Sequence, residues 1–80
     1  MTNEEKYNKA FTESFAIEKD KLSGLKYQDI KSWDSIGHMQ LMAALEDVFG
    51  VELDIDDITD FSSYEEGNNI LSKYDVDLNI

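Results

Sequence analysis

The stretch SWDSIGHMQLMAALEDVFG (residues 32–50) has the hydrophobic spacing of an amphipathic helix, with capping residues before it and a glycine at its end. At about 100° per residue, one side of this helix collects apolar residues suited to a core. They are Leu41, Met42, Leu45, Val48 and Phe49, together with His38. Asp34 or Ser35 can cap the start of the helix, and Gly50 can end it. We therefore expect a helix over about 35–49.

The opposite side of the same helix mixes large apolar residues with carboxylates. It holds Ile36, Met39, Gln40, Ala43 and Asp47, with Glu46 at the flank. Two interpretations remain open. The face contacts a partner protein, or Ile36 and Met39 tuck under a short helix after residue 54 and belong to the core.

The rest of the chain also follows helical patterns. We expect a first helix over about 3–18 capped by Thr2 or Asn3, a loop over 19–34, a short helix over 55–61 and a last helix over 63–74, with a tail at 75–80. Ser63 and Glu66 are spaced as a capping box, whereas Gly67 weakens the last helix. The segment VELDI (residues 51–55) is too short and acidic for a sheet. The predicted fold is one all-α domain over 1–80: a small antiparallel four-helix bundle of three main helices and one short one, with a long loop between the first two.

Charge limits the choice of partners. The chain has 18 acidic residues, seven lysines and no arginine, for a net charge of −11. Residues 1–34 hold seven acids and six lysines, while residues 35–80 hold eleven acids and only Lys73. This field disfavours nucleic acid and anionic membranes, favours basic partners, and is typical of a monomer kept apart by self-repulsion. The absence of cysteine, of a signal segment and of a 20-residue apolar run predicts a cytoplasmic protein.

Ser35 has two interpretations from its position alone. It can cap the helix, or its hydroxyl can carry a phosphodiester, because unpaired N–H groups and the helix dipole favour an anion there. Gly37, two residues on, is expected to leave room beside the hydroxyl for a bulky group or an enzyme.

Asp34, Ser35 and Ile36, followed by Met39, Leu41, Leu45, Glu46 and Phe49 and then an acidic tract, resemble the acyl carrier proteins and the wider group of phosphopantetheine carriers. The match is to the D-S-[LI] signature, and the helical layout extends it over most of the chain. The resemblance implies that a phosphopantetheinyl transferase attaches the 4′-phosphopantetheine of coenzyme A to Ser35. The distal thiol of this arm then carries an acyl or aminoacyl thioester.

The resemblance also implies roles for the neighbours of Ser35. Asp34 matches the aspartate that helps to hold the magnesium ion of the transferase. Ile36, Met39, Ala43, Glu46 and Asp47 match the face offered to ligases and synthase enzymes with basic docking patches, and Gln40 shares that face. Gln40 stands where many fatty-acid carriers have an acid, and Gly37-His38 replaces a more polar pair. The segment WDSIGHM (residues 33–39) is similar to the corresponding segment of stand-alone carriers in polyketide, peptide or surface-polysaccharide pathways, and of D-alanyl carriers.

Other classes of function fit less well. A catalytic Ser35 with His38 as base lacks an orienting carboxylate, and the wheel turns His38 toward the core. The acids at Asp54, Asp56, Asp57 and Asp60, and the DVDLN run at 75–79, do not match a calcium-binding EF-hand loop, so we expect no metal site and no enzyme. The serious alternative is an acidic helical interaction module without a prosthetic group, in which Ser35 is only a cap.

Overall fold

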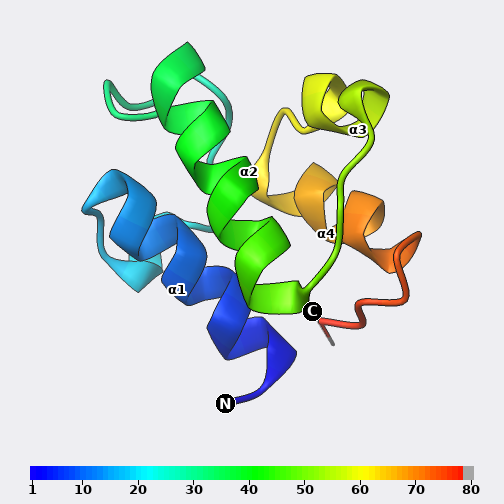
Figure 1. Ribbon diagram of the computed structural model, residues 1–80. Coiled ribbons are helices and arrows are strands. Elements are labelled where there is room, and N and C mark those ends of the chain that lie inside the picture. Colours follow the sequence, from blue (N-terminus) through cyan, green and yellow to red (C-terminus); the bar gives the residue numbers. More distant parts are fainter. Residues whose placement is uncertain (79–80) are drawn as a thin grey trace.

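The computed structural model describes residues 1–78, which form an all-α bundle (Figure 1). Its helices are α1 (Asn3–Phe15), α2 (Ser35–Phe49), α3 (Ile55–Asp60) and α4 (Tyr64–Ser72), with one turn of 3-10 helix at Lys19–Lys21. α1 and α2 pack together and run in opposite directions (Figure 1). Within residues 1–78 the only paired extended backbone is an isolated bridge between Lys26 and Ser63. The predicted fold class is therefore confirmed; residues 79 and 80 of the expected tail lie outside the described residues.

α1 begins at a full capping box and ends at Phe15, not near residue 18. The Thr2 hydroxyl accepts the Glu5 amide at 3.1 Å, and the Glu5 carboxylate accepts the Thr2 amide at 2.9 Å. These bonds to Thr2 lower the pKa of Glu5. The helix stops because Ala16 adopts a left-handed conformation with φ 55°. The Ser32 hydroxyl donates to the Phe15 carbonyl at 3.1 Å, which satisfies one of the carbonyls that a helix end leaves unpaired.

α4 is capped by Ser63, whose hydroxyl accepts the Glu66 amide at 2.9 Å. It ends at Ser72 and not at residue 74, because the Lys73 and Tyr74 amides donate to carbonyls three residues back, those of Ile70 and Leu71, at 3.1 and 2.9 Å. The Val76 amide donates to the Leu71 carbonyl at 3.2 Å, and Asp75 takes the left-handed conformation with φ 63°. The turn directs Val76 into the core, where it is buried.

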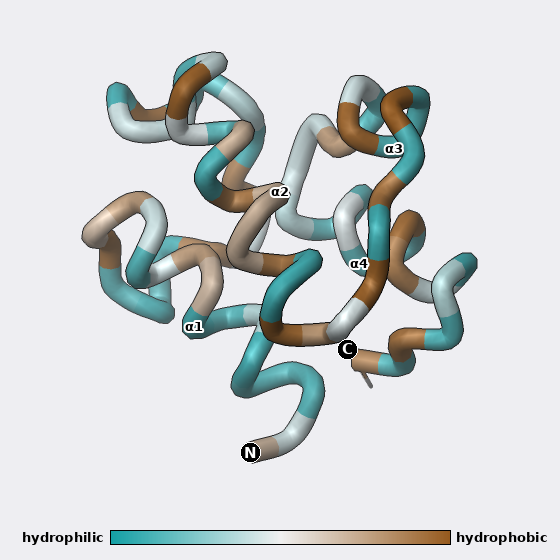
Figure 2. The backbone as a smooth tube through the Cα atoms, in the orientation of Figure 1, coloured by the Kyte–Doolittle hydropathy of each residue, from teal (hydrophilic) through white to brown (hydrophobic). Residues whose placement is uncertain are grey.

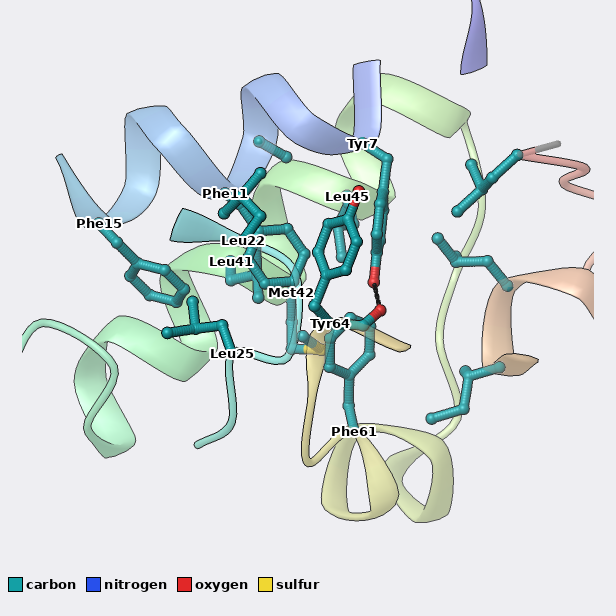
Figure 3. Packing of buried hydrophobic residues seen from close by; sticks show 14 of the residues in the cluster. Tyr7, Phe11, Phe15, Leu22, Leu25, Leu41, Met42, Leu45, Phe61 and Tyr64 are labelled. Atoms are coloured by element: carbon teal, nitrogen blue, oxygen red, sulfur yellow. Dashed lines mark hydrogen bonds between the residues drawn. The ribbon is translucent and has the colours of Figure 1, made fainter. Parts of the chain in front are cut away.

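The core is rich in aromatic rings. Figure 3 shows Tyr7, Phe11 and Phe15 of α1 facing α2, with Phe61 and Tyr64 next to them. The Tyr7 hydroxyl donates to the Tyr64 carbonyl at 2.6 Å (Figure 3), and burial raises the pKa of Tyr7, so this hydroxyl stays a neutral donor. Figure 2 shows hydrophilic and hydrophobic stretches alternating along the chain, as amphipathic helices require.

Two residues of α2 and α4 differ from their sequence interpretation. Val48, expected in the core, is 38% exposed, because it lies at the margin of the apolar stripe in an open hollow beside Ala10 of α1. Gly67 is not merely a weak helix former. A Cβ atom at Gly67 would lie 2.2 Å from both the Phe61 ring and the Tyr7 hydroxyl, so the glycine allows α4 to reach the core.

The long loop between α1 and α2 is hydrogen-bonded to the connection between α3 and α4 and to the first residue of α4. The Tyr27 amide donates to the Ser62 carbonyl and the Tyr64 amide to the Leu25 carbonyl, both at 2.9 Å. Trp33, near the end of the loop, is fully buried. This anchoring fixes the point at which α2 begins. None of the helices formed by residues 1–78 has the length and apolar character that a membrane span requires.

Candidate functional site

Asp34, and not Ser35, caps α2. The Asp34 side chain accepts the Gly37 amide at 2.8 Å, and its backbone is extended with φ −102° and ψ −168°. Ser35 is the first helical residue and its side chain is exposed. The interpretation of Ser35 as a cap is therefore wrong, and its hydroxyl faces solvent beside the positive end of a 15-residue helix.

Gly37 serves the packing beneath the helix and not access to the hydroxyl. It is buried, and a Cβ atom there would lie 1.8 Å from the Ser32 carbonyl oxygen and 3.3 Å from the Phe15 ring. The expectation that Gly37 leaves room beside Ser35 is therefore wrong. The loop backbone passes so close to α2 that only glycine fits.

His38 lies one turn after Ser35 and points inward, as its position on the wheel predicts. The Trp33 indole N–H donates to its Nδ1 at 2.9 Å, and its Nε2 lies 2.8 Å from the Ile58 carbonyl oxygen. Both ring nitrogens are thus engaged in joining the loop, α2 and α3. A role for His38 as the base of a Ser35 nucleophile does not fit this arrangement, because the ring is turned away from solvent and held at both nitrogens.

The outward face of α2 is apolar at its N-terminal end. Ile36 is 71% exposed and Met39 is 54% exposed, so the interpretation that they tuck under α3 is wrong. Gln40, Ala43 and Asp47 are also exposed. Glu46 differs from these, because it is half-buried and its carboxylate accepts the Leu53 amide at 2.8 Å, which holds the connection between α2 and α3.

Sequence reasoning missed Ile55 as an exposed residue. Its side chain is 78% exposed, while that of Phe61, at the other end of the expected helix, is buried. A helix of six residues has too few turns for periodicity to decide which side faces inward. Two features of the sequence could have indicated that Ile55 lies at the surface: the short length of α3 and the two neighbouring acids, Asp54 and Asp56.

Asp57, considered above as a calcium ligand, is a structural residue. Its carboxylate accepts a hydrogen bond from Lys73 Nζ at 2.5 Å and another from the Tyr74 hydroxyl at 2.5 Å. These bonds lower the pKa of Asp57, the bond from Lys73 most. In the part of the chain that the structure describes, no group of three or more His, Asp or Glu side chains is arranged to hold a metal ion.

An exposed hydroxyl on a helix N-terminus is chemically suited to hold a phosphodiester. The macrodipole favours the anion, and the Ser35 oxygen is not needed for capping. No deep cleft is required, because an attached arm reaches away from the surface.

The comparisons with known proteins agree with this geometry. Residues 33–66, which run from Trp33 through α2 and α3 into α4, match the family described as phosphopantetheine attachment site. The chain is 41% identical over 61 residues to an acyl carrier protein of Lactobacillus johnsonii, an alignment that covers 71% of this chain and 76% of the relative. No solved structure matches the chain significantly.

Proposed function

We propose that Ser35 carries the prosthetic arm of this protein, because the chain belongs to the acyl carrier protein family. Members of this family are carriers and not enzymes, and they hold acyl groups on a covalently attached 4′-phosphopantetheine. The thioester chemistry is performed by the enzymes that the carrier visits. An acidic interaction module without a prosthetic group does not account for a match to the attachment site.

The observation that carries the proposal is the division of roles between Asp34 and Ser35. Asp34 satisfies the Gly37 amide, which leaves the Ser35 hydroxyl exposed at the start of α2. A transferase reaches this oxygen without unfolding the helix start. Asp34 Oδ1 is held in place by the Gly37 amide, so the carboxylate has a fixed position beside Ser35 from which to contact the magnesium ion of the transferase.

The partner face consists of exposed side chains on α2 and α3. It comprises Ile36, Met39, Gln40, Ala43 and Asp47, to which the exposure of Ile55 adds a residue of α3. Apolar contacts ringed by carboxylates suit transferases, ligases and synthases with basic patches, because charge speeds the encounter and apolar contact adds affinity. Glu46 contributes charge near this face while its carboxylate holds Leu53. We place the carrier in the cytoplasm as a monomer, in keeping with its strong negative charge.

The test is intact-protein mass spectrometry after incubation with coenzyme A and a broad-specificity phosphopantetheinyl transferase. We expect the mass of one phosphopantetheine to be added and peptide mapping to place it on Ser35. Ser35→Ala should remain unmodified, whereas Ser62→Ala, which removes another exposed hydroxyl, should be modified normally. Addition at a different side chain, or none in the folded wild-type protein, would overturn the proposal.

A further inference from the structure

Tyr74 lies outside the partner face, yet its hydroxyl bonds to α3 at two positions. The hydroxyl accepts the Asp54 amide at 2.9 Å and donates to Asp57 Oδ2 at 2.5 Å. Residues three apart lie on neighbouring turns of one helix face, so this single oxygen spans the first turn of α3. Ile55 stands between the two bonded residues, and its side chain is mostly exposed. Tyr74 therefore holds the inner side of the turn whose outer side carries Ile55.

The first turn of α3 depends on contacts from outside the helix. Within residues 54–60 the side chain of Asp54, the residue before α3, makes no capping bond, and a helix of six residues is not stable by itself. The Lys73 ammonium donates to Asp57 Oδ1 at 2.5 Å, but it sits on a flexible stem and bonds only to the carboxylate. The Tyr74 hydroxyl joins the carboxylate to the Asp54 amide.

Bonds from α2 hold the segments on either side of this turn. The Glu46 carboxylate accepts the Leu53 amide at 2.8 Å, and His38 Nε2 lies 2.8 Å from the Ile58 carbonyl oxygen. These two bonds stop short of residues 54–57. The turn that carries Ile55 is thus held from the end of α4 and not from α2.

The chain around Tyr74 is itself anchored in the core. The Tyr74 and Val76 amides both donate to the Leu71 carbonyl, at 2.9 and 3.2 Å. Leu71 and Val76 are buried. A tyrosine side chain rotates about only two bonds, so its hydroxyl projects from a fixed base. The position of α3 is in this way set by the core at the end of α4.

We propose that Tyr74 is a positioning residue for the docking of partner enzymes: by fixing the first turn of α3, it holds Ile55 ready for contact. This inference rests on the proposed function, because it concerns the partner face beside Ser35. A docking side chain that is fixed before the encounter loses less conformational freedom on binding. The apparent affinity falls in proportion to the fraction of molecules in which the face is in place. Tyr74 acts through Ile55 and not by contact with the reacting hydroxyl.

The experiment measures kcat and KM of a broad-specificity phosphopantetheinyl transferase, with coenzyme A saturating and the unmodified carrier as the varied substrate. Tyr74→Phe keeps the ring and removes the hydroxyl. We expect KM to rise by about fivefold, the factor that corresponds to one net hydrogen bond. The value of kcat should not change, because the bond from the Gly37 amide to Asp34 still fixes the start of α2. An unchanged KM, or a loss in kcat alone, would overturn the proposal.

A double-mutant cycle tests whether Tyr74 acts through Ile55. Ile55→Ala removes the exposed side chain and should raise KM by itself. In the Ile55→Ala background, Tyr74→Phe should add little further increase, because residues that act through one contact are not additive. Additive increases in KM, or a KM of Ile55→Ala equal to that of wild type, would contradict the proposal.

Tyr64→Phe is the matched control for a merely structural effect. It also removes one tyrosine hydroxyl and its hydrogen bond, in this case the bond to Asn8 Oδ1 between α4 and α1. We expect this variant to melt at a lower temperature than wild type, with an unchanged KM. An equal rise of KM in Tyr64→Phe and Tyr74→Phe would show that general stability, and not the position of α3, determines docking.

Amide hydrogen exchange gives a second readout that needs no enzyme. The Ile58 amide donates to the Asp54 carbonyl at 3.0 Å, so its exchange reports the opening of α3. Exchange of this amide should be faster in Tyr74→Phe than in wild type and unchanged in Tyr64→Phe. Equal exchange in Tyr74→Phe and wild type would show that the hydroxyl does not hold the turn.

Failure of this inference is distinguishable from failure of the proposed function. The proposed function fails when the folded wild-type protein gains no phosphopantetheine on Ser35. The inference fails when wild type is modified at Ser35 and the loss of the Tyr74 hydroxyl leaves KM and the exchange of α3 as they were.

Discussion

At Gly37 a single missing methyl group determines how α2 meets the rest of the molecule. Helix propensity opposes glycine at this position by about 1 kcal/mol relative to alanine. The close approach of the Ser32 carbonyl, 1.8 Å from the position of a Cβ atom, outweighs that preference, because the atom in the way belongs to the backbone and cannot rotate aside. Tertiary contact therefore decides the residue type here.

Gly37→Ala should lower the free energy of unfolding by about 1–3 kcal/mol, the usual cost of overpacking a tight site, despite the gain in propensity. Urea unfolding of the two proteins measures the difference. Ala43→Gly is the matched control, because Ala43 is exposed on the same helix and should lose about 1 kcal/mol from propensity alone. A Gly37→Ala protein more stable than wild type would contradict the packing seen here.

Among the elements, α3 depends most on its neighbours. It has six residues, far fewer than the roughly 12–15 that an isolated helix needs for stability. Asp57 anchors it to the end of α4 through Lys73 and Tyr74, and the Tyr74 hydroxyl also accepts the Asp54 amide at 2.9 Å. These bonds fix the helix that carries Ile55.

Asp57→Asn should therefore destabilise the protein in a pH-dependent way. The pKa of Asp57 is lowered from its ordinary 3.8 in the folded state, so the stability it contributes is complete above that value. It is lost as the pH falls through the lowered pKa. Thermal melts should show wild type above Asp57→Asn at neutral pH, with the gap closing in acid. Asp56→Asn, an equal change of charge at an exposed neighbour, should show no such gap.

The partner face of α2 and α3 can be tested by placing a charge on it. Ile36→Asp or Ile55→Asp should reduce kcat/KM of an enzyme acting on the loaded carrier by roughly tenfold or more, about 1.4 kcal/mol. Unfolding should change little, since both side chains are mostly exposed. Val48→Asp adds the same charge to another side of α2 and should leave transfer unchanged. A large loss of stability with normal transfer would show that the two isoleucines serve packing.

Elements were predictable from sequence where local signals determine them. A capping residue at Asp34 or Ser35, Gly50 and the spacing of the core leucines specify α2 within one stretch of chain, and only the structure shows that Asp34 is the cap. Contacts between distant segments were not predictable. From its own helix Glu46 reads as a surface acid, and its bond to Leu53 is seen only in the fold. The end of α1 and the turn that follows α4 depend on left-handed residues, Ala16 and Asp75, that carry no glycine signal.

At the scale of the whole molecule, the family was recognisable because its motif is local, whereas the surroundings of His38 depend on the assembled core. The order Asp34, Ser35, Ile36 can be read directly along the chain. The hydrogen bonds of His38 join Trp33 in the loop to Ile58 in α3, and the bond to Ile58 spans 20 residues. No helical wheel contains that contact, since it joins two helices.

Charge acts over the whole molecule, which measures 30 × 26 × 19 Å. Residues 35–80 hold eleven acids, and their one lysine, Lys73, is already paired with Asp57. At an ionic strength of about 0.01 M the Debye length is about 30 Å, so these carboxylates repel one another across the full bundle, whereas at 0.15 M it is about 8 Å.

The melting temperature should therefore rise between these conditions, by about 4–8 °C for each 1 kcal/mol of repulsion relieved. The variant Glu52→Gln, which removes one exposed acid, should melt higher than wild type at low salt, and its melting temperature should respond less to added salt. A wild-type melting temperature that does not change with ionic strength would mean that the self-repulsion is already balanced within the fold.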